Sequence, residues 1–201
     1  GLPPALQFSV TAGGNIALQN FMNGFGSHTV AAITTAYRVD TIMLLPIINL
    51  GSAISTMVAQ SKGAGEPQRA RHFWRTGAVM NLVVSLLLMA VLLFGGKLVA
   101  LFGVEAEAAA IGRRFFQRIA LFYIFFGLAN SMRGTLEGTG RVVYSSAVSV
   151  AALLLRIALS YLLAAPFHNM AIPYAEGLHW IFMVLCFLPF FLRRDRWAQN
   201  S

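Results

Sequence analysis

The sequence predicts an all-α integral membrane protein built as a bundle of six transmembrane helices. Only 11% of the 201 residues are charged and 57% are hydrophobic, whereas a soluble domain averages roughly 25% charged residues because water hydrates its surface. The charges also cluster, which leaves charge-free runs at 1–37, 41–61, 76–96 and 157–175. Each run is long enough for a helix that crosses hydrocarbon, which takes about 20 residues. Strand-like alternation is scarce, and backbone groups in lipid must bond within their own segment, so these runs predict helices.

The first two predicted helices cover residues 3–23 and 27–61. Pro3 suits the start of the first helix, where a backbone N–H would have no intrahelical partner. In the second helix, Pro46 lies in the interior. It removes one backbone hydrogen bond there and predicts a kink. We expect the polar residues from 62 to 75 to form a loop.

The remaining helices are predicted at 76–96, 109–130, 142–165 and 169–192. Turn-forming or polar connections separate them, and Pro166 ends the fifth helix. We therefore expect one transmembrane lobe over residues 1–192, followed by a basic cytoplasmic tail over residues 193–201.

Basic residues predict the orientation of the lobe, because cytoplasmic connections carry an excess of Lys and Arg. The connections on one side hold Lys62, Arg69, Arg71, Arg75, Arg133, Arg141, Arg193, Arg194 and Arg196; those on the other hold Lys97, Arg113 and Arg114. Both ends of this segment are thus predicted to be cytoplasmic. The net charge of +8 follows from this bias and from contact with anionic lipid headgroups. It does not indicate nucleic acid, because no folded basic surface remains once the spans are removed.

Four charged side chains lie inside the predicted spans: Arg38, Asp40, Arg156 and Glu176. At 1.5 Å per residue, each lies roughly 12 to 18 Å from the outer end of its helix. A charge at this depth costs about 2.5 to 3.5 kcal/mol on insertion scales, so such groups pair or line a water-filled cavity. Arg38 and Asp40 point to nearly opposite sides of one helix, so their partners must come from other helices.

Our hypothesis is a neutral cluster in which Arg38 and Arg156 reach Glu176 and Asp40 beside a transport cavity. The alternative is a set of ion pairs that only holds the bundle together, since buried pairs often specify packing.

The first helix carries a polar stripe, because Gln7, Thr11, Asn15 and Gln19 repeat every four residues. A stripe of this kind suits the wall of a water-filled path. The alternative is hydrogen bonding between helices, worth about 0.6 to 2 kcal/mol per contact.

Several segments resemble those of one transporter family. They are 1–3 (GLP), 58–66 (VAQSKGAGE) with 69–71 (RAR), 132–140 (MRGTLEGTG), and 169–172 (NMAI) with 175–177 (AEG) and Trp180. In this order they are similar to the C-terminal half of the multidrug and toxic compound extrusion (MATE) family, across essentially the whole chain.

The resemblance implies one lobe of a twelve-helix exporter whose two lobes are related by an axis along the membrane normal. The N-terminal lobe would precede Gly1, which is not an initiating Met. Members of the family exchange H⁺ or Na⁺ for organic, often cationic, compounds by alternating access between the two faces of the membrane. The implied partners are the lipid bilayer of the plasma (inner) membrane, small organic substrates, a coupling cation and the missing lobe.

The chain departs from the family's Na⁺-coupled branch, which has acidic residues where this sequence has Thr11 and Phe126. The pattern looks more like the DinF-like branch, which implies coupling to H⁺. The carboxylate that carries the proton would then lie in the other lobe or be Glu176 or Asp40. A carboxylate in apolar surroundings binds a proton more readily than one in water.

Two alternatives remain beside a drug exporter. One is a flippase for lipid-linked precursors, which should show several cavity-facing Arg or Lys residues. The other is a structural membrane subunit without transport. An enzyme is not expected, because the sequence has no G-x-S-x-G or H-E-x-x-H motif and no paired catalytic aspartates. No cofactor is expected, and Cys186, the single cysteine, predicts neither a disulfide nor a cysteine metal site.

Overall fold

The charge-free runs of the sequence form long helices in the computed structural model, which describes residues 13–14, 16–94 and 106–192. In this part of the chain, five spans are long and apolar enough to cross a membrane. Residues 13–14 and 16–23 are helical as well and belong to the predicted first helix, whose other residues lie outside the described ones.

The described elements follow one another without a strand among them. They are α2 (Ser27–Gly63), α3 (Pro67–Phe94), α4 (Ala106–Ile119), the 3₁₀ turn η2 (Ala120–Phe122), α5 (Tyr123–Gly138), α6 (Val142–Leu162), α7 (Ala164–Phe167), η3 (His168–Met170) and α8 (Ala171–Leu192). Together α4, η2 and α5 make one span, and α7, η3 and α8 make another.

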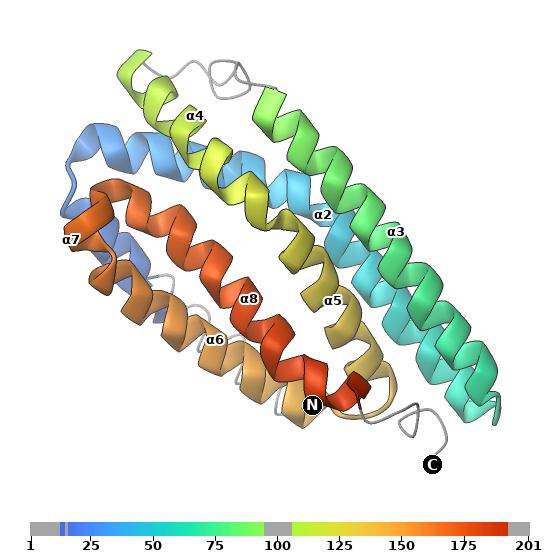
Figure 1. Ribbon diagram of the computed structural model, residues 1–201. Helices are drawn as coiled ribbons and strands as arrows, with labels where there is room; N and C mark the ends of the chain where they lie inside the picture. Colours follow the sequence, from blue (N-terminus) through green and yellow to red (C-terminus); the bar gives the residue numbers. More distant parts are fainter. Residues whose placement is uncertain (1–12, 15, 95–105, 193–201) are drawn as a thin grey trace.

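Helix α5 lies at the centre of the bundle. It packs against α2 and α3 on one side and against α8 and α6 on the other. The N-terminal half of α2 (blue) crosses behind α4 toward α7, so α2 reaches the side of α6 and α8 there (Figure 1). Large apolar side chains cover outward-facing surfaces of the bundle, most densely on α3, where Val79, Met80, Leu82, Val83, Leu86, Leu87 and Val91 are exposed. A continuous apolar surface of this kind needs lipid around it. The predicted all-α membrane fold is therefore confirmed.

Two connections are more helical than the sequence suggested. Helix α3 begins at Pro67 instead of residue 76, because proline is favoured in the first helical turn and polar residues can extend a helix into water. Helix α5 continues to Gly138 through the predicted loop. An ion pair one turn apart, Arg133 with Glu137 at 2.7 Å, stabilises this extension.

The ends of α2 and α5 that lie on the predicted cytoplasmic side, which we call the inner side of the lobe, finish in the same way. Gly65 and Gly140 have φ angles of +71° and +87°. The N–H groups that follow them, of Glu66 and Arg141, bond back to the carbonyls of Ser61 and Leu136 at 2.8 and 2.9 Å. This pattern is the Schellman motif, which requires a left-handed residue after the helix. The motif explains one glycine in each family-like segment, Gly65 in 58–66 and Gly140 in 132–140, by backbone geometry.

Helix α2 changes direction near its middle (Figure 1) and contains Pro46 in its interior. A proline there removes a backbone bond and bends the helix. The bend separates an outer half, which carries Arg38 and Asp40, from an inner half that packs against α5.

Candidate functional site

A group of interacting polar side chains lies between four helices in the outer half of the lobe. We call it the buried charge cluster; its members are Tyr37 and Asp40 of α2, Tyr123 of α5, Arg156 of α6 and Glu176 of α8. Asp40 is 4% exposed and Glu176 is 7% exposed. Such groups are stable at this depth only when other polar groups bind them.

Three members of the cluster form a closed triangle. The Arg156 guanidinium makes an ion pair with Glu176, and its Nη2 donates to the Tyr37 hydroxyl at 2.9 Å. That hydroxyl in turn donates to Glu176 Oε2 at 3.2 Å. The triangle joins α2, α6 and α8, so each helix holds a polar group that depends on the other two.

Asp40 forms the second part of the cluster. Its Oδ1 accepts a hydrogen bond from the Tyr123 hydroxyl, and its carboxylate is within electrostatic range of Glu176 and Arg156. The Tyr123 ring packs edge-on against Trp180, with ring centroids 6.0 Å apart. Because η2, a short 3₁₀ turn, directly precedes Tyr123, the helix geometry changes where this donor reaches the carboxylate.

The cluster is not electrically balanced. It holds two carboxylates, Asp40 and Glu176, and one guanidinium, Arg156, while both tyrosines are neutral donors. With all three charged groups ionised, the net charge is therefore −1. His179 lies next to the cluster, with its Nδ1 3.9 Å from Glu176 Oε1. Binding one proton or one cation would neutralise the excess charge, and this is the chemistry that the arrangement can perform.

Arg38 does not join the cluster, which corrects our hypothesis for this residue. Its side chain is exposed and lines an open groove on the outer half of α2. Within the described residues, no ion pair joins it to Asp40 or Glu176. The reason is helical geometry, because Asp40 is buried two residues further on and side chains two apart point away from each other.

The polar stripe of the first helix falls mostly outside the described residues. Gln7, Thr11 and Asn15 belong to the part that the structure does not describe. Gln19 is exposed, and its amide donates to Asn23 at 3.4 Å. The stripe as a wall of the pathway therefore stays a prediction.

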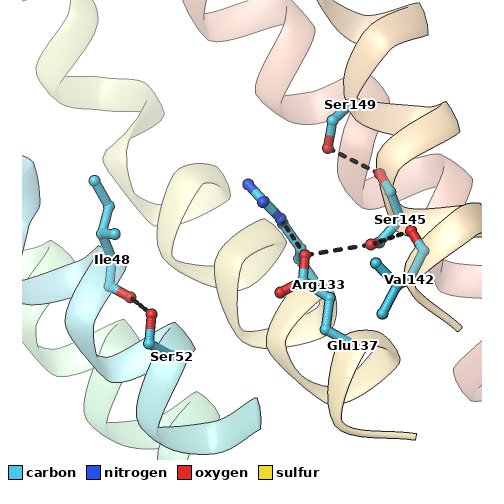
Figure 2. Close-up of polar contacts among 7 residues, drawn as sticks. All are labelled: Ile48, Ser52, Arg133, Glu137, Val142, Ser145 and Ser149. Carbon is cyan, nitrogen blue, oxygen red and sulfur yellow. Dashed lines mark hydrogen bonds and ion pairs between the residues drawn. The ribbon is translucent and has the colours of Figure 1, made fainter. Parts of the chain in front are cut away.

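A second polar network lies at the inner end of the lobe, between α5 and α6. Figure 2 shows the Glu137 carboxylate as its meeting point, reached by Arg133 from the preceding helical turn and by Ser145 from α6 at 3.2 Å. On the neighbouring α2, the Ser52 hydroxyl donates within its own helix, to the Ile48 carbonyl. The network joins two helices, but its ion pair is partly exposed.

Comparison with known proteins identifies the family. Residues 3–162 match the family model MatE, which is well over half of the chain. The chain belongs to the MatE family.

Curated relatives of this MatE chain are described as multidrug resistance proteins. "Probable multidrug resistance protein YoeA" from Bacillus subtilis is 28% identical over 154 residues, which make up 76% of this chain and 33% of that protein. "Probable multidrug resistance protein NorM" from Bradyrhizobium diazoefficiens is 30% identical over 143 residues, 69% of this chain and 30% of that protein. The chain thus spans about a third of the curated relatives that it matches.

Solved structures show the same fold. An outward-facing multidrug resistance MATE family transporter of the MOP superfamily superposes with a TM-score of 0.90 at 20% identity, covering 100% of this chain and 45% of that one. A MOP superfamily transporter from Pyrococcus furiosus gives a TM-score of 0.87 at 20% identity, over 97% of this chain and 44% of that one. The six-helix bundle therefore corresponds to one lobe of a MATE-type transporter.

Sequence reasoning missed the two tyrosines of the buried charge cluster. Tyr37 and Tyr123 look like ordinary aromatic residues in apolar helices, because a hydroxyl does not interrupt a hydrophobic run. One signal was available for Tyr37: it lies three residues before Asp40, on the same face of α2. Nothing local marks Tyr123, which α5 brings to Asp40 from 83 positions away.

Proposed function

We propose that this chain is the C-terminal lobe of a secondary active exporter that exchanges H⁺ for organic, often cationic, compounds by alternating access. Membership of the MatE family and the transporter fold support export, and the DinF-like pattern supports H⁺ over Na⁺. A second six-helix lobe completes the exporter, consistent with relatives that are much longer than this chain. The bias of basic residues supports an inner-membrane location with both ends of this segment in the cytoplasm.

The observation that carries the proposal is the net negative charge of the buried charge cluster. A charge without compensation at membrane depth is unfavourable, so the cluster with Asp40, Glu176 and Arg156 ionised favours binding of one positive charge. A proton on Asp40 or Glu176 satisfies this need, and so does an organic cation close by. Once a proton or an organic cation has neutralised the cluster, the affinity for the other is lower. Their binding is therefore mutually exclusive, which is the thermodynamic basis of exchange.

The tyrosines give this exchange a structural consequence. Tyr37 and Tyr123 donate to Glu176 and Asp40, and hydrogen bonds to an ionised carboxylate are stronger than those to a neutral one. Protonation of either carboxylate therefore weakens a bond between α2 and a neighbouring helix. A proton could thus change the packing of α2 against α5 or α8, as alternating access requires.

The experiment is an exchange assay in inside-out vesicles from cells that express the whole protein containing this chain. Vesicles are acidified inside, and an organic cation such as ethidium is added. We expect the cation to release H⁺ from wild-type vesicles, whereas Glu176→Gln and Asp40→Asn should lose this release because each variant makes the cluster neutral. Glu66→Gln is the matched control, because Glu66 is an exposed acid that pairs with Arg69 at 2.9 Å at the inner surface.

Two outcomes would contradict the proposal. Wild-type vesicles that release no H⁺ with any organic cation tested would argue for a structural subunit. H⁺ release that persists in both cluster variants would place the coupling carboxylate in the other lobe. Replacing the pH gradient by a Na⁺ gradient tests the coupling ion separately, and we expect no exchange under that condition.

A further inference from the structure

The outer half of α2 presents two different faces. Thr29, Ile33, Ala36 and Asp40 form a buried stripe toward the bundle. The opposite stripe borders an open groove of about 560 Å³, which we call the α2 groove; it is lined by Asn23, Gly26, Ser27, Val30, Ala31, Thr34, Thr35 and Arg38. Its volume is within the range of small-molecule sites. The groove holds one charge, that of Arg38, so the helix separates a negative cluster from a positive groove.

Arg38 is placed to bind an anion. It lies eleven residues after Ser27, about 17 Å along the helix, and is exposed. No ion pair or hydrogen bond occupies its guanidinium in the described part of the chain. A charge at this depth is stable only beside water or a partner of opposite charge. A guanidinium offers paired N–H donors that match a carboxylate or a phosphate.

The threonines beside Arg38 offer further donors. In the membrane helices of this lobe, many Ser and Thr hydroxyls bond to the carbonyl one turn earlier, as Thr41, Ser52, Thr56 and Ser131 do. Among the described residues, Thr34 and Thr35 have no such bond and no other hydrogen-bond partner. Their hydroxyls remain available to a ligand in the groove, on the same stretch of α2 as the guanidinium.

We propose that the α2 groove binds the carboxylate or phosphate group of a small organic compound, so that the transported substrates include anionic and zwitterionic molecules. This inference rests on the proposed export function and extends its substrate class. Arg38 binds the anionic group, and Thr34 and Thr35 donate to its oxygens.

The test measures equilibrium binding, so it does not depend on transport. The whole protein is purified into phosphatidylcholine nanodiscs, and binding of carboxyfluorescein, an anionic dye, is measured by fluorescence anisotropy. We expect Arg38→Gln to raise the Kd at least about tenfold, as loss of a charge-assisted hydrogen-bonded pair does. Arg38→Lys should recover part of the affinity, and a Thr34→Val, Thr35→Val double variant should give a smaller rise.

Two controls make the result specific. Arg69→Gln removes an exposed arginine at the inner surface and should leave the Kd for the anionic dye unchanged. Ethidium binding to Arg38→Gln should be no weaker than to wild type, which also shows that the variant is folded. If Arg38→Gln raises the Kd for both dyes alike, Arg38 supports the structure by pairing with the other lobe, and the inference is wrong.

Further measurements identify the source of the anion and distinguish failure of this inference from failure of the proposed export function. In nanodiscs that contain phosphatidylglycerol, unchanged dye affinity supports a soluble anion. Weaker dye binding in wild type but not in Arg38→Gln indicates instead that a lipid phosphate occupies the groove, which overturns the inference about transported substrates. An anionic dye that binds wild type and Arg38→Gln within about twofold of each other also overturns it. Failure of H⁺ exchange with ethidium, together with Arg38-dependent dye binding, would overturn only the proposed exporter.

Discussion

The outer and inner halves of the lobe hold their helices together by different means. In the outer half, side chains do so: Glu176 of α8 pairs with Arg156 of α6 and accepts a hydrogen bond from the Tyr37 hydroxyl of α2. In the inner half, backbones touch: a Cβ at Gly134 of α5 would collide with the Gly51 carbonyl of α2. Side-chain partners can be exchanged with small movements, whereas close-packed backbones have one arrangement. The comparison indicates that the outer half can respond to a bound ion while the inner half stays rigid.

The largest expected effect comes from breaking the Arg156–Glu176 pair. Glu176→Leu removes the ion-pair partner of the buried Arg156 guanidinium, which should lower the free energy of unfolding by about 3–5 kcal/mol. The Arg156→Leu, Glu176→Leu double variant removes both charges and should recover most of that loss. Thermal unfolding of the whole protein in detergent measures both.

The same double variant separates a functional pair from a structural one. We expect it to be stable and yet inactive in H⁺ exchange, because the carboxylate that remains, Asp40, is no longer connected to α6 and α8 through Arg156 and Glu176. If it transports like wild type, the pair only holds the bundle together, and the outer half is no more responsive than the inner half.

The next effect concerns the donor to Asp40. Tyr123→Phe keeps the buried ring but removes the hydroxyl that bonds the carboxylate; loss of a hydrogen bond to a charged group costs about 1.5–3 kcal/mol. Tyr161→Phe is the control, because that side chain is exposed and its hydroxyl has no hydrogen-bond partner among the described residues. Equal stability of the two variants would show that the Tyr123 hydroxyl is not needed.

A comparable or smaller effect is expected where backbones touch. Gly134→Ala places a methyl group against a main-chain oxygen that cannot move aside, and such overpacking costs about 1–3 kcal/mol. Gly63→Ala lies in the last turn of α2 with open space around it, so it should be neutral or stabilising. A Gly134→Ala protein that unfolds at the wild-type temperature would mean that the inner half is not rigid.

The smallest effect should come from the inner polar network. Glu137→Gln removes an ion pair one turn apart, whose side chains are 35% and 27% exposed, and such pairs contribute about 0.2–0.5 kcal/mol. We therefore expect a shift in unfolding temperature close to the limit of measurement. A loss as large as that of Glu176→Leu would contradict the contrast between the two halves.

Much of the fold follows from local properties of the sequence. The length of apolar runs and the position of charges predict spans in lipid without knowledge of their neighbours. The ends of the helices were harder to predict from the sequence. Helix α3 starts at Pro67 and α5 ends at Gly138, beyond the predicted spans, because polar residues in water can be helical or not. The depth of the charged residues in the membrane could also be predicted from single helices, since it depends on the distance along one helix.

The residue types and their depth along the helices already require partners for Asp40, Arg156 and Glu176, because an isolated charge in hydrocarbon is unfavourable. Which partners they have depends on the packing of the helices. Helix packing brings Tyr123 to Asp40 and Tyr37 between Arg156 and Glu176, and the rotation of α2 turns Arg38 outward into the groove. Both depend on how one helix is rotated against the next, which the composition of a single helix does not fix.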